Sequence, residues 1–277
     1  MATLIGIGRD RASGGERGFA LIIVLWLIVL AALIVTQVTA LGRREARVAL
    51  NLKSAAAAEA GADGAVYEAI SHLLRQDPGW AADRQSHRIV VGTATVDLEI
   101  EDENGKANLN AAPAIVLAAL IQQFGVDGGR AQAVANGIID WRGDSDDPGQ
   151  HAQMATRYQA AGLNYAPTGE AFSNVDELGL VLGMTPDLLA RLKPHVTIDS
   201  GGGIDPDHTD PILAQALRKV PPALVPPVPP TAGNNTVTID AAATGPDRAL
   251  FERRALIRLS GNQNGAYAIL GWNRATQ

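Results

Sequence analysis

The sequence predicts an α+β fold with a long amino-terminal helix, an antiparallel sheet and a large helical insertion. An uncharged apolar run at residues 19–41 continues, without proline, into an amphipathic segment at residues 43–74. Alternating apolar and polar residues then indicate strands at residues 88–109 and again after residue 236. Helical patterns fill the sequence between these strands, so we expect the last strands to complete the sheet that the first ones begin.

The composition indicates a globular body attached to this helix. The chain has 277 residues, of which 47% are hydrophobic and 19% are charged, as in ordinary globular proteins. Cysteine is absent, which excludes disulfide bonds, thiolate zinc sites and cysteine nucleophiles. The formal net charge of -6 argues against a general affinity for nucleic acid, because phosphates attract a basic surface.

The apolar run is long enough to cross a membrane. A helix rises about 1.5 Å per residue, so the run spans about 34 Å, and the hydrocarbon core of a bilayer is about 30 Å thick. Three interpretations are open: a signal peptide cut after Val38-Thr39-Ala40, an uncleaved signal anchor, and the helix that remains after a leader ending at Gly18 is removed. Signal peptides have a shorter apolar region of about 7–15 residues. Arginines flank both ends of the run, so charge alone does not fix the orientation.

Short alternating segments predict the strands of the sheet. Val96, Leu98 and Ile100 alternate with polar residues, which is the pattern of a strand buried on one face. Gly92 lies between two such segments and favours a tight turn, so they form a hairpin. The segments NTVTIDAAA, ERRALIRLS and AYAILGWNR predict further strands near the carboxyl terminus.

Residues 110–220 predict a block of helices. Asn110 is a candidate N-cap for the first helix, and Thr185-Pro186 separates two helical pieces within residues 173–198. A glycine-rich turn at residues 201–203 precedes a last helix. Prolines then crowd into residues 221–230 and predict a semi-rigid, extended linker.

An acidic loop lies inside the helical block. Asp144, Asp146 and Asp147 stand close together among glycine and proline residues. Calcium takes about six to eight oxygen ligands from flexible loops of this kind, although no glutamate completes an EF-hand pattern here. The residues leave two interpretations open, a calcium site and a solvated acidic turn.

Residues 175–196 resemble a helix-hairpin-helix, a unit that in other proteins grips a nucleic-acid backbone. Such a unit needs basic side chains near the hairpin. Only Arg191 and Lys193 are basic close to it, beside three acidic residues. We therefore expect a packing module and not a nucleic-acid site.

No catalytic arrangement is visible in the sequence. The five histidines are scattered with no pair at metal-ligand spacing, and there is no serine nucleophile elbow. The Gly-Ile-Gly at residues 6–8 follows no strand, so it is not a dinucleotide fingerprint. We therefore do not expect an enzyme.

Several phrases spread along the chain, taken together, match one known family. The first is Arg17-Gly18-Phe19-Ala20-Leu21, at the front edge of the apolar run. The others are Asp102-Glu103-Asn104-Gly105-Lys106, Asn108-Leu109-Asn110, Ile139-Asp140-Trp141, Gly183-Met184-Thr185-Pro186 and Ala268-Ile269-Leu270-Gly271-Trp272. With these phrases the chain resembles the minor pseudopilin K family of type II secretion systems, also called general secretion pathway protein K.

This resemblance implies a pilin-like fold. In that fold a long transmembrane and amphipathic helix packs on an antiparallel sheet that carries a helix-hairpin-helix or SAM-like insertion. The implied segments are a cleaved prepilin leader (1–18), a transmembrane helix (19–41), the pilin-like helix and first strands (42–109), the helical insertion (110–220), a proline-rich linker (221–235) and the strands that complete the sheet (236–277).

The resemblance also implies a function and partners. Such a protein is a minor pseudopilin at the pseudopilus tip, which forms a complex with minor pseudopilins I and J, initiates or caps the filament and supports export of folded proteins across the outer membrane. The major pseudopilin and the prepilin peptidase are further implied partners, and the peptidase cuts between Gly18 and Phe19 and methylates the new amine. The implied location is the inner membrane, with a single pass and the C-terminal domain in the periplasm. The alternative is a membrane-anchored helix-hairpin-helix nucleic-acid-binding protein of a DNA-uptake system.

Two positions depart from the common pattern. Ile23 stands where most pilin-like proteins have a glutamate, and the lack of that carboxylate fits a subunit with none above it. The resemblance implies calcium as the ion at Asp144, Asp146 and Asp147. Gln153 stands where the family usually has a glutamate, so one expected carboxylate ligand is absent.

Overall fold

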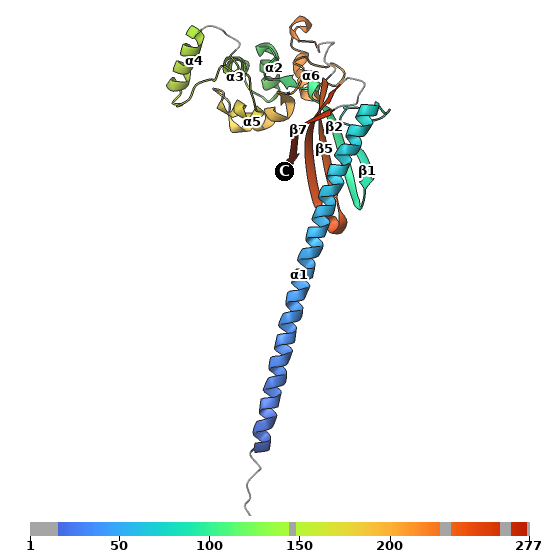
Figure 1. The fold of residues 1–277 in the computed structure, drawn as a ribbon. Helices are drawn as coiled ribbons and strands as arrows, with labels where there is room; N and C mark the ends of the chain where they lie inside the picture. Colours follow the sequence, from blue (N-terminus) through green and yellow to red (C-terminus); the bar gives the residue numbers. More distant parts are fainter. Residues whose placement is uncertain (1–15, 144–147, 228–233, 261–266, 276–277) are drawn as a thin grey trace, which may run out of the picture. The chain divides into compact units, whose positions relative to one another are not determined.

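The computed structural model describes the chain except residues 1–15, 144–147, 228–233, 261–266 and 276–277 (Figure 1). At a few further positions beside these gaps and in the apolar run, only the backbone is described. The chain divides into two compact units, Met1–Ser54 and Ala55–Gln277. Helix α1 (Glu16–Arg75) contributes residues to both units.

In the first unit, the described part is the N-terminal portion of α1, and its apolar side chains are exposed. Leu21 is 72% exposed and Trp26 is 70% exposed. The hydroxyls of Thr36 and Thr39 donate to carbonyls one turn earlier, so these polar groups are satisfied within the helix. Among the residues that the structure describes, no helix is both long enough and apolar enough to span a membrane.

The second unit contains an antiparallel sheet, which confirms the predicted fold class at this level. The strands lie in the order β1-β2-β5-β6-β7. In that order they span His87–Val91, Ala94–Asp102, Asn234–Thr244, Leu250–Ser260 and Tyr267–Arg274. Because β2 pairs with β5, strands from the two sides of the helical segment are neighbours in one sheet (Figure 1).

The C-terminal part of α1 packs on this sheet through small side chains. On its buried face, fully buried alanines recur at helical spacing: Ala58, Ala62, Ala65 and Ala69. An alanine projects only a methyl group, so the helix can lie close to the strands. The approach is closest at Gly61, where an added Cβ would stand 2.5 Å from the Cβ of Ala94.

One charged side chain also joins α1 to the sheet. Arg253 of β6 is buried, and its Nε donates to Asp63 at 2.6 Å while its Nη2 donates to Glu59 at 3.1 Å. Its guanidinium lies over the rings of Phe251 and Trp272. These directional contacts fix which face of α1 meets the sheet.

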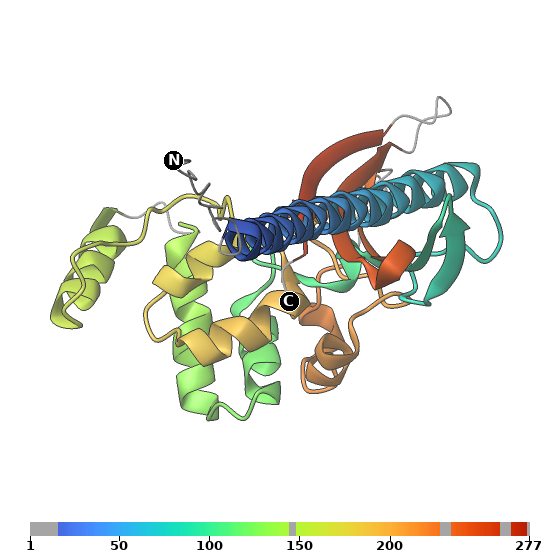
Figure 2. The same ribbon diagram turned by 90° about the horizontal axis from the view of Figure 1, so that it is seen from below.

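The helical block lies between β2 and β5 in the chain. Helices α2 to α6 span Ala114–Gln123, Gly128–Trp141, Pro148–Ala160, Pro186–Leu192 and Pro211–Leu217. Short 3-10 turns η1 to η4 span Glu103–Gly105, Val175–Leu180, Lys193–His195 and Pro222–Leu224, and a fifth, η5 (Pro246–Arg248), lies outside the block between β5 and β6. The short strands β3 (Ala107–Asn108) and β4 (Val196–Thr197) pair in parallel. Figure 2 shows the green α2 and α3 beside the yellow α5.

Large apolar side chains fill the core of this block. The fully buried ones include Leu117, Leu120, Ile138, Leu178 and Leu192. An aromatic group extends the core, because the ring of Trp141 lies near the rings of Tyr158, Tyr165 and Phe172, with centroids 6.3 to 6.4 Å apart. The helices of the block therefore interlock through side chains of high volume.

Side chains cap two of the helix starts in the block. The Thr185 side chain accepts from the N–H of Leu188, and α5 begins at Pro186 as predicted. At the start of η2, Asn174 and Glu177 form a capping box. The element that this capping box begins is a 3-10 turn.

The predicted role of Asn110 is wrong. Pro113 stands at the N-cap of α2, and Asn110 instead exchanges two hydrogen bonds with the backbone of Phe172, at 3.0 and 2.7 Å. Proline has no side-chain acceptor, and at this helix start its carbonyl accepts from the N–H groups of Val116 and Leu117, at 3.0 and 3.2 Å. The asparagine is thereby free to hold a distant segment of the block.

Candidate functional site

The joint between the sheet and the helical block is built on η1, the turn that follows β2. The N–H groups of Asp205 and Asp210 donate to the carbonyls of Asn104 and Gly105, at 3.0 and 2.8 Å. Gly105 has no room for a side chain, since a Cβ there would stand 2.2 Å from the carbonyl oxygen of His208. The loop before α6 is therefore held against the end of β2.

Charged side chains reinforce this joint. Lys106 is buried, and its Nζ lies 2.8 Å from Glu101 and 2.7 Å from Glu103. Burial alone would lower the pKa of Lys106, but the carboxylates of Glu103 and Glu101 outweigh it and hold the pKa above its ordinary value. Arg84 lies 2.6 Å from Glu101 and 3.5 Å from Asp210. Cations and carboxylates thus alternate across the joint.

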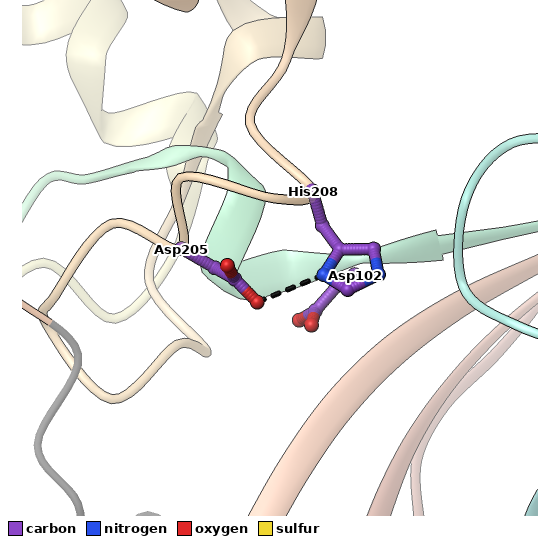
Figure 3. Close-up of side chains that lie close together, drawn as sticks. All are labelled: Asp102, Asp205 and His208. Atoms are coloured by element: carbon purple, nitrogen blue, oxygen red, sulfur yellow. Dashed lines mark hydrogen bonds and ion pairs between the residues drawn. The ribbon is translucent and has the colours of Figure 1, made fainter.

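Asp102, Asp205 and His208 meet at the same place (Figure 3). Asp102 ends β2, whereas Asp205 and His208 lie on the loop before α6. One nitrogen or oxygen atom from each side chain lies within 4.8 Å of the other two. The Nδ1 of His208 is 2.8 Å from Oδ2 of Asp205, and Figure 3 shows the Asp102 carboxylate turned toward this pair. The group therefore combines one imidazole with two carboxylates.

Burial and neighbouring charge set the protonation of this group. Burial raises the pKa of Asp102, against the hydrogen bond that it accepts from the backbone of Asn104. The hydrogen bond to Asp205 raises the pKa of His208. Burial alone would raise the pKa of Asp205, but the hydrogen bonds from His208 and from the backbone of Asp207 outweigh it and lower the pKa.

The residues of the predicted processing site lie near the start of α1. Helix α1 begins at Glu16 and includes both Gly18 and Phe19. The side chain of Phe19 is 67% exposed. Cleavage between them stays a prediction.

The predicted calcium ligands Asp144, Asp146 and Asp147 lie outside the described residues. Just before them, Asp140 near the end of α3 has its pKa raised by burial. Its carboxylate is 3.9 Å from the guanidinium of Arg157 on α4. Calcium binding at this loop stays a prediction.

The hairpin at residues 175–196 has balanced charges. Arg191 pairs with Asp187 at 2.9 Å, and Lys193 pairs with Asp176. Both basic side chains that a nucleic-acid backbone would need are thus already matched by carboxylates. The buried leucines of the hairpin belong to the core of the block, which favours the packing role.

The sequence does not predict the group of Asp102, Asp205 and His208, because His208 stands in it as one of five scattered histidines. The helical block returns the chain to the end of β2, and only this return brings the histidine to Asp102. The visible signal was the spacing of Asp205 and His208, three residues apart on one loop.

Comparisons with known proteins place this fold in a family. A family profile described as "Type II secretion system (T2SS), protein K" matches residues 50–200. One similar solved chain comes from the crystal structure of the GspK-GspI-GspJ complex of the enterotoxigenic Escherichia coli type 2 secretion system. It aligns with a TM-score of 0.56 over 85% of this chain and 99% of that chain, at 17% sequence identity, which shows a shared fold.

No curated protein matched the sequence. The family profile nevertheless covers more than half of the chain, from the C-terminal part of α1 to the loop after β4. The chain therefore belongs to the protein K family of type II secretion systems, whose members are minor pseudopilins.

Proposed function

We propose that this minor pseudopilin occupies the tip of the pseudopilus and caps it, as a single-pass inner-membrane protein whose C-terminal domain lies in the periplasm. Its role is structural and not enzymatic. The observation that carries the tip position is the place of the helical block beside the C-terminal end of α1.

Several segments meet at that end of the Ala55–Gln277 unit. One cavity is lined by Leu73 near the end of α1, by Trp80 on the following loop, by Asp102 of β2 and by His208 of the loop before α6. Figure 1 shows the helices of the block at the same end of the sheet. A subunit stacked on this end would meet the block, which supports a capping role.

The sequence and the exposed side chains of α1 support the membrane anchor. Residues 19–41 carry no charge, and the described apolar side chains there, such as Ile28 and Leu30, are more than half exposed. Thr36 and Thr39 satisfy their hydroxyls within the helix, which lowers the cost of placing them in lipid. In this proposal the prepilin peptidase cuts after Gly18, and the helix that remains holds the protein in the inner membrane.

The proposed partners are minor pseudopilins I and J and the major pseudopilin. The similar solved chain was crystallised as part of a GspK-GspI-GspJ complex. Beyond the uncharged run, α1 also exposes Val48 and Leu52, four residues apart on one helix face, at 57% and 67%. Such a stripe is suited to packing against the helix of another pilin-like subunit.

The capping proposal can be tested by filament length. The major pseudopilin is overproduced with the full chain, with a variant in which a short Gly/Ser bridge replaces residues 110–220, or with neither. We expect short filaments with the full chain and longer filaments with the deletion variant, because the block no longer obstructs the next subunit. Equal lengths in all three would contradict capping.

Ile23→Glu provides a matched control in the same assay. It restores the carboxylate of ordinary pilin-like helices and leaves the block intact. If the block is what obstructs the next subunit, filaments grown with Ile23→Glu should be as short as those grown with the full chain. Membrane fractionation of each variant verifies that the protein is inserted.

We also propose calcium at Asp144, Asp146 and Asp147. Three carboxylates within four residues repel one another, and a bound cation relieves that repulsion. A ligand that binds only the folded state stabilises it, so removing calcium with a selective chelator is expected to lower the unfolding temperature. An unchanged melting curve in chelator would indicate a solvated turn.

A further inference from the structure

The group formed by Asp102, Asp205 and His208 has the geometry of a metal site. Its three candidate ligand atoms lie within 4.8 Å of one another and come from two segments far apart in the chain. One nitrogen and two oxygens of this kind can surround a single ion at bonds of about 2.0 to 2.2 Å after small side-chain movements.

Asp102 provides an independent reason to expect a ligand. Its side chain is buried, with the residue only 5% exposed. Its Oδ1 accepts from the N–H of Asn104 at 2.8 Å. The described ion pairs give Asp102 no lysine or arginine partner, and they pair Asp205 only with His208. Two carboxylates thus share one imidazole as their nearest cationic group, so a metal ion would neutralise negative charge that burial makes costly.

An open cavity reaches this group. It has a volume of about 410 Å³, and Asp102 and His208 belong to its lining. Trp80 and Pro78 line another part of the wall. Water and a small ion can therefore reach the ligand atoms, and water can fill any remaining coordination position.

We propose that Asp102, Asp205 and His208 bind one divalent transition-metal ion, for which Zn²⁺ is the best match. Zinc accepts mixed imidazole and carboxylate ligands at low coordination number, with water in the fourth position. Calcium needs about six to eight oxygen ligands, and magnesium prefers octahedral oxygen sites. The proposed ligands differ from those of the acidic loop at residues 144–147, which contains no histidine.

The bound ion would close the joint between the two parts of the Ala55–Gln277 unit. Asp102 ends a strand of the sheet, whereas Asp205 and His208 belong to the segment that leaves the helical block. The backbone bonds from this loop to Asn104 and Gly105 already hold the two together. A metal ion adds a bridge between side chains at the same point, so it stabilises the joint against opening.

The test is zinc binding by the full-length protein in detergent micelles. Equilibrium dialysis against Zn²⁺ measures affinity and stoichiometry, and the visible spectrum with Co²⁺ reports the coordination geometry. We expect one saturable site in the wild type. His208→Gln and Asp205→Asn are expected to weaken it on the order of 100-fold, and to remove the tetrahedral Co²⁺ bands. Circular dichroism without metal checks that both variants fold.

Two control variants locate the site. His195→Gln removes a histidine that pairs with Asp210 and lies outside the group, so it should leave the zinc site intact. A variant with asparagine at Asp144, Asp146 and Asp147 should also retain it. No saturable zinc site in the wild type, undiminished binding by His208→Gln, or loss of binding only in the acidic-loop variant would each overturn the proposal.

Discussion

The helices of the Ala55–Gln277 unit bring side chains of different size to its two cores. Against the sheet, α1 presents alanines and Gly61, and the helix lies close to the strands. In the helical block, fully buried leucines and isoleucines and a group of aromatic rings fill the space between helices. The contact of α1 with the sheet therefore depends on a close fit of shapes, whereas the contacts between the helices of the block depend on buried volume. Opposite kinds of substitution should damage the two cores.

The largest effect is expected from removing volume in the block. Leu120 of α2 is fully buried, so Leu120→Ala should lower the free energy of unfolding by about 2–5 kcal/mol. Urea unfolding measures it, with the fluorescence of buried Trp141 as a local probe. Ile115→Ala on the same helix is the control, because Ile115 is 37% exposed. Equal losses in the two variants would show that the core is not packed as described.

A smaller effect, of the opposite kind, is expected from adding volume to the sheet core. In Gly61→Ala the new Cβ would lie 2.5 Å from the Cβ of Ala94, an atom that can move only with its backbone. Overpacking costs about 1–3 kcal/mol, and alanine regains about 1 kcal/mol of helix propensity. We therefore expect a net loss of up to about 2 kcal/mol, measured by urea unfolding.

Gly64→Ala sharpens this test. Its new Cβ would lie 2.7 Å from Cγ1 of Val91, a methyl group that a side-chain rotation can move away. The helix-propensity gain should then prevail, and the variant should be neutral or more stable by up to about 1 kcal/mol. If Gly64→Ala lowers the free energy of unfolding more than Gly61→Ala does, the close approach of α1 to the sheet at Gly61 is not as described.

The smallest effect concerns Glu177 in the capping box of the block. The hydrogen bond from Ser173 is the largest cause that lowers the pKa of Glu177, and those from Trp141 and Asn174 add to it, against burial. A lowered pKa means that the ionised form stabilises the fold above the ordinary value of 4.5, and that this contribution is lost as the pH falls below it. Glu177→Gln should cost about 0.5–1 kcal/mol at pH 7.

The pH dependence provides the control for this prediction. The difference between the wild type and Glu177→Gln should shrink when urea unfolding is repeated at progressively lower pH, because both side chains are then neutral. A difference that stays constant down to full protonation would mean that the charge of Glu177 contributes nothing.

Much of this architecture could be predicted from local patterns. The alternation of Val96, Leu98 and Ile100 with polar residues predicts β2, and Gly92 predicts the turn before it. Thr185 predicts the start of α5. Each signal is local, because the pleat and the helix cap are decided by residues a few positions apart.

The contacts that join distant segments could not be predicted in this way. Asn110 looks like a helix cap, but it binds the backbone of Phe172, which is distant in the chain. Asp102 looks like an ordinary strand residue, and it meets His208 only because the intervening block folds back. Arg253 of β6 bonds to Asp63 of α1, and these two residues meet only because the helix packs on the completed sheet. Such partners depend on tertiary packing, which one sequence does not reveal.

The most direct test of the claim that the chain works as a membrane-anchored pseudopilin is mass spectrometry of the protein extracted from membranes. The account predicts a mature amino terminus at methylated Phe19, because a cut after Gly18 removes the leader and leaves the whole apolar run of residues 19–41 in the helix. A protein that retains Met1, or one that begins at Leu41 after signal-peptide cleavage, would contradict it.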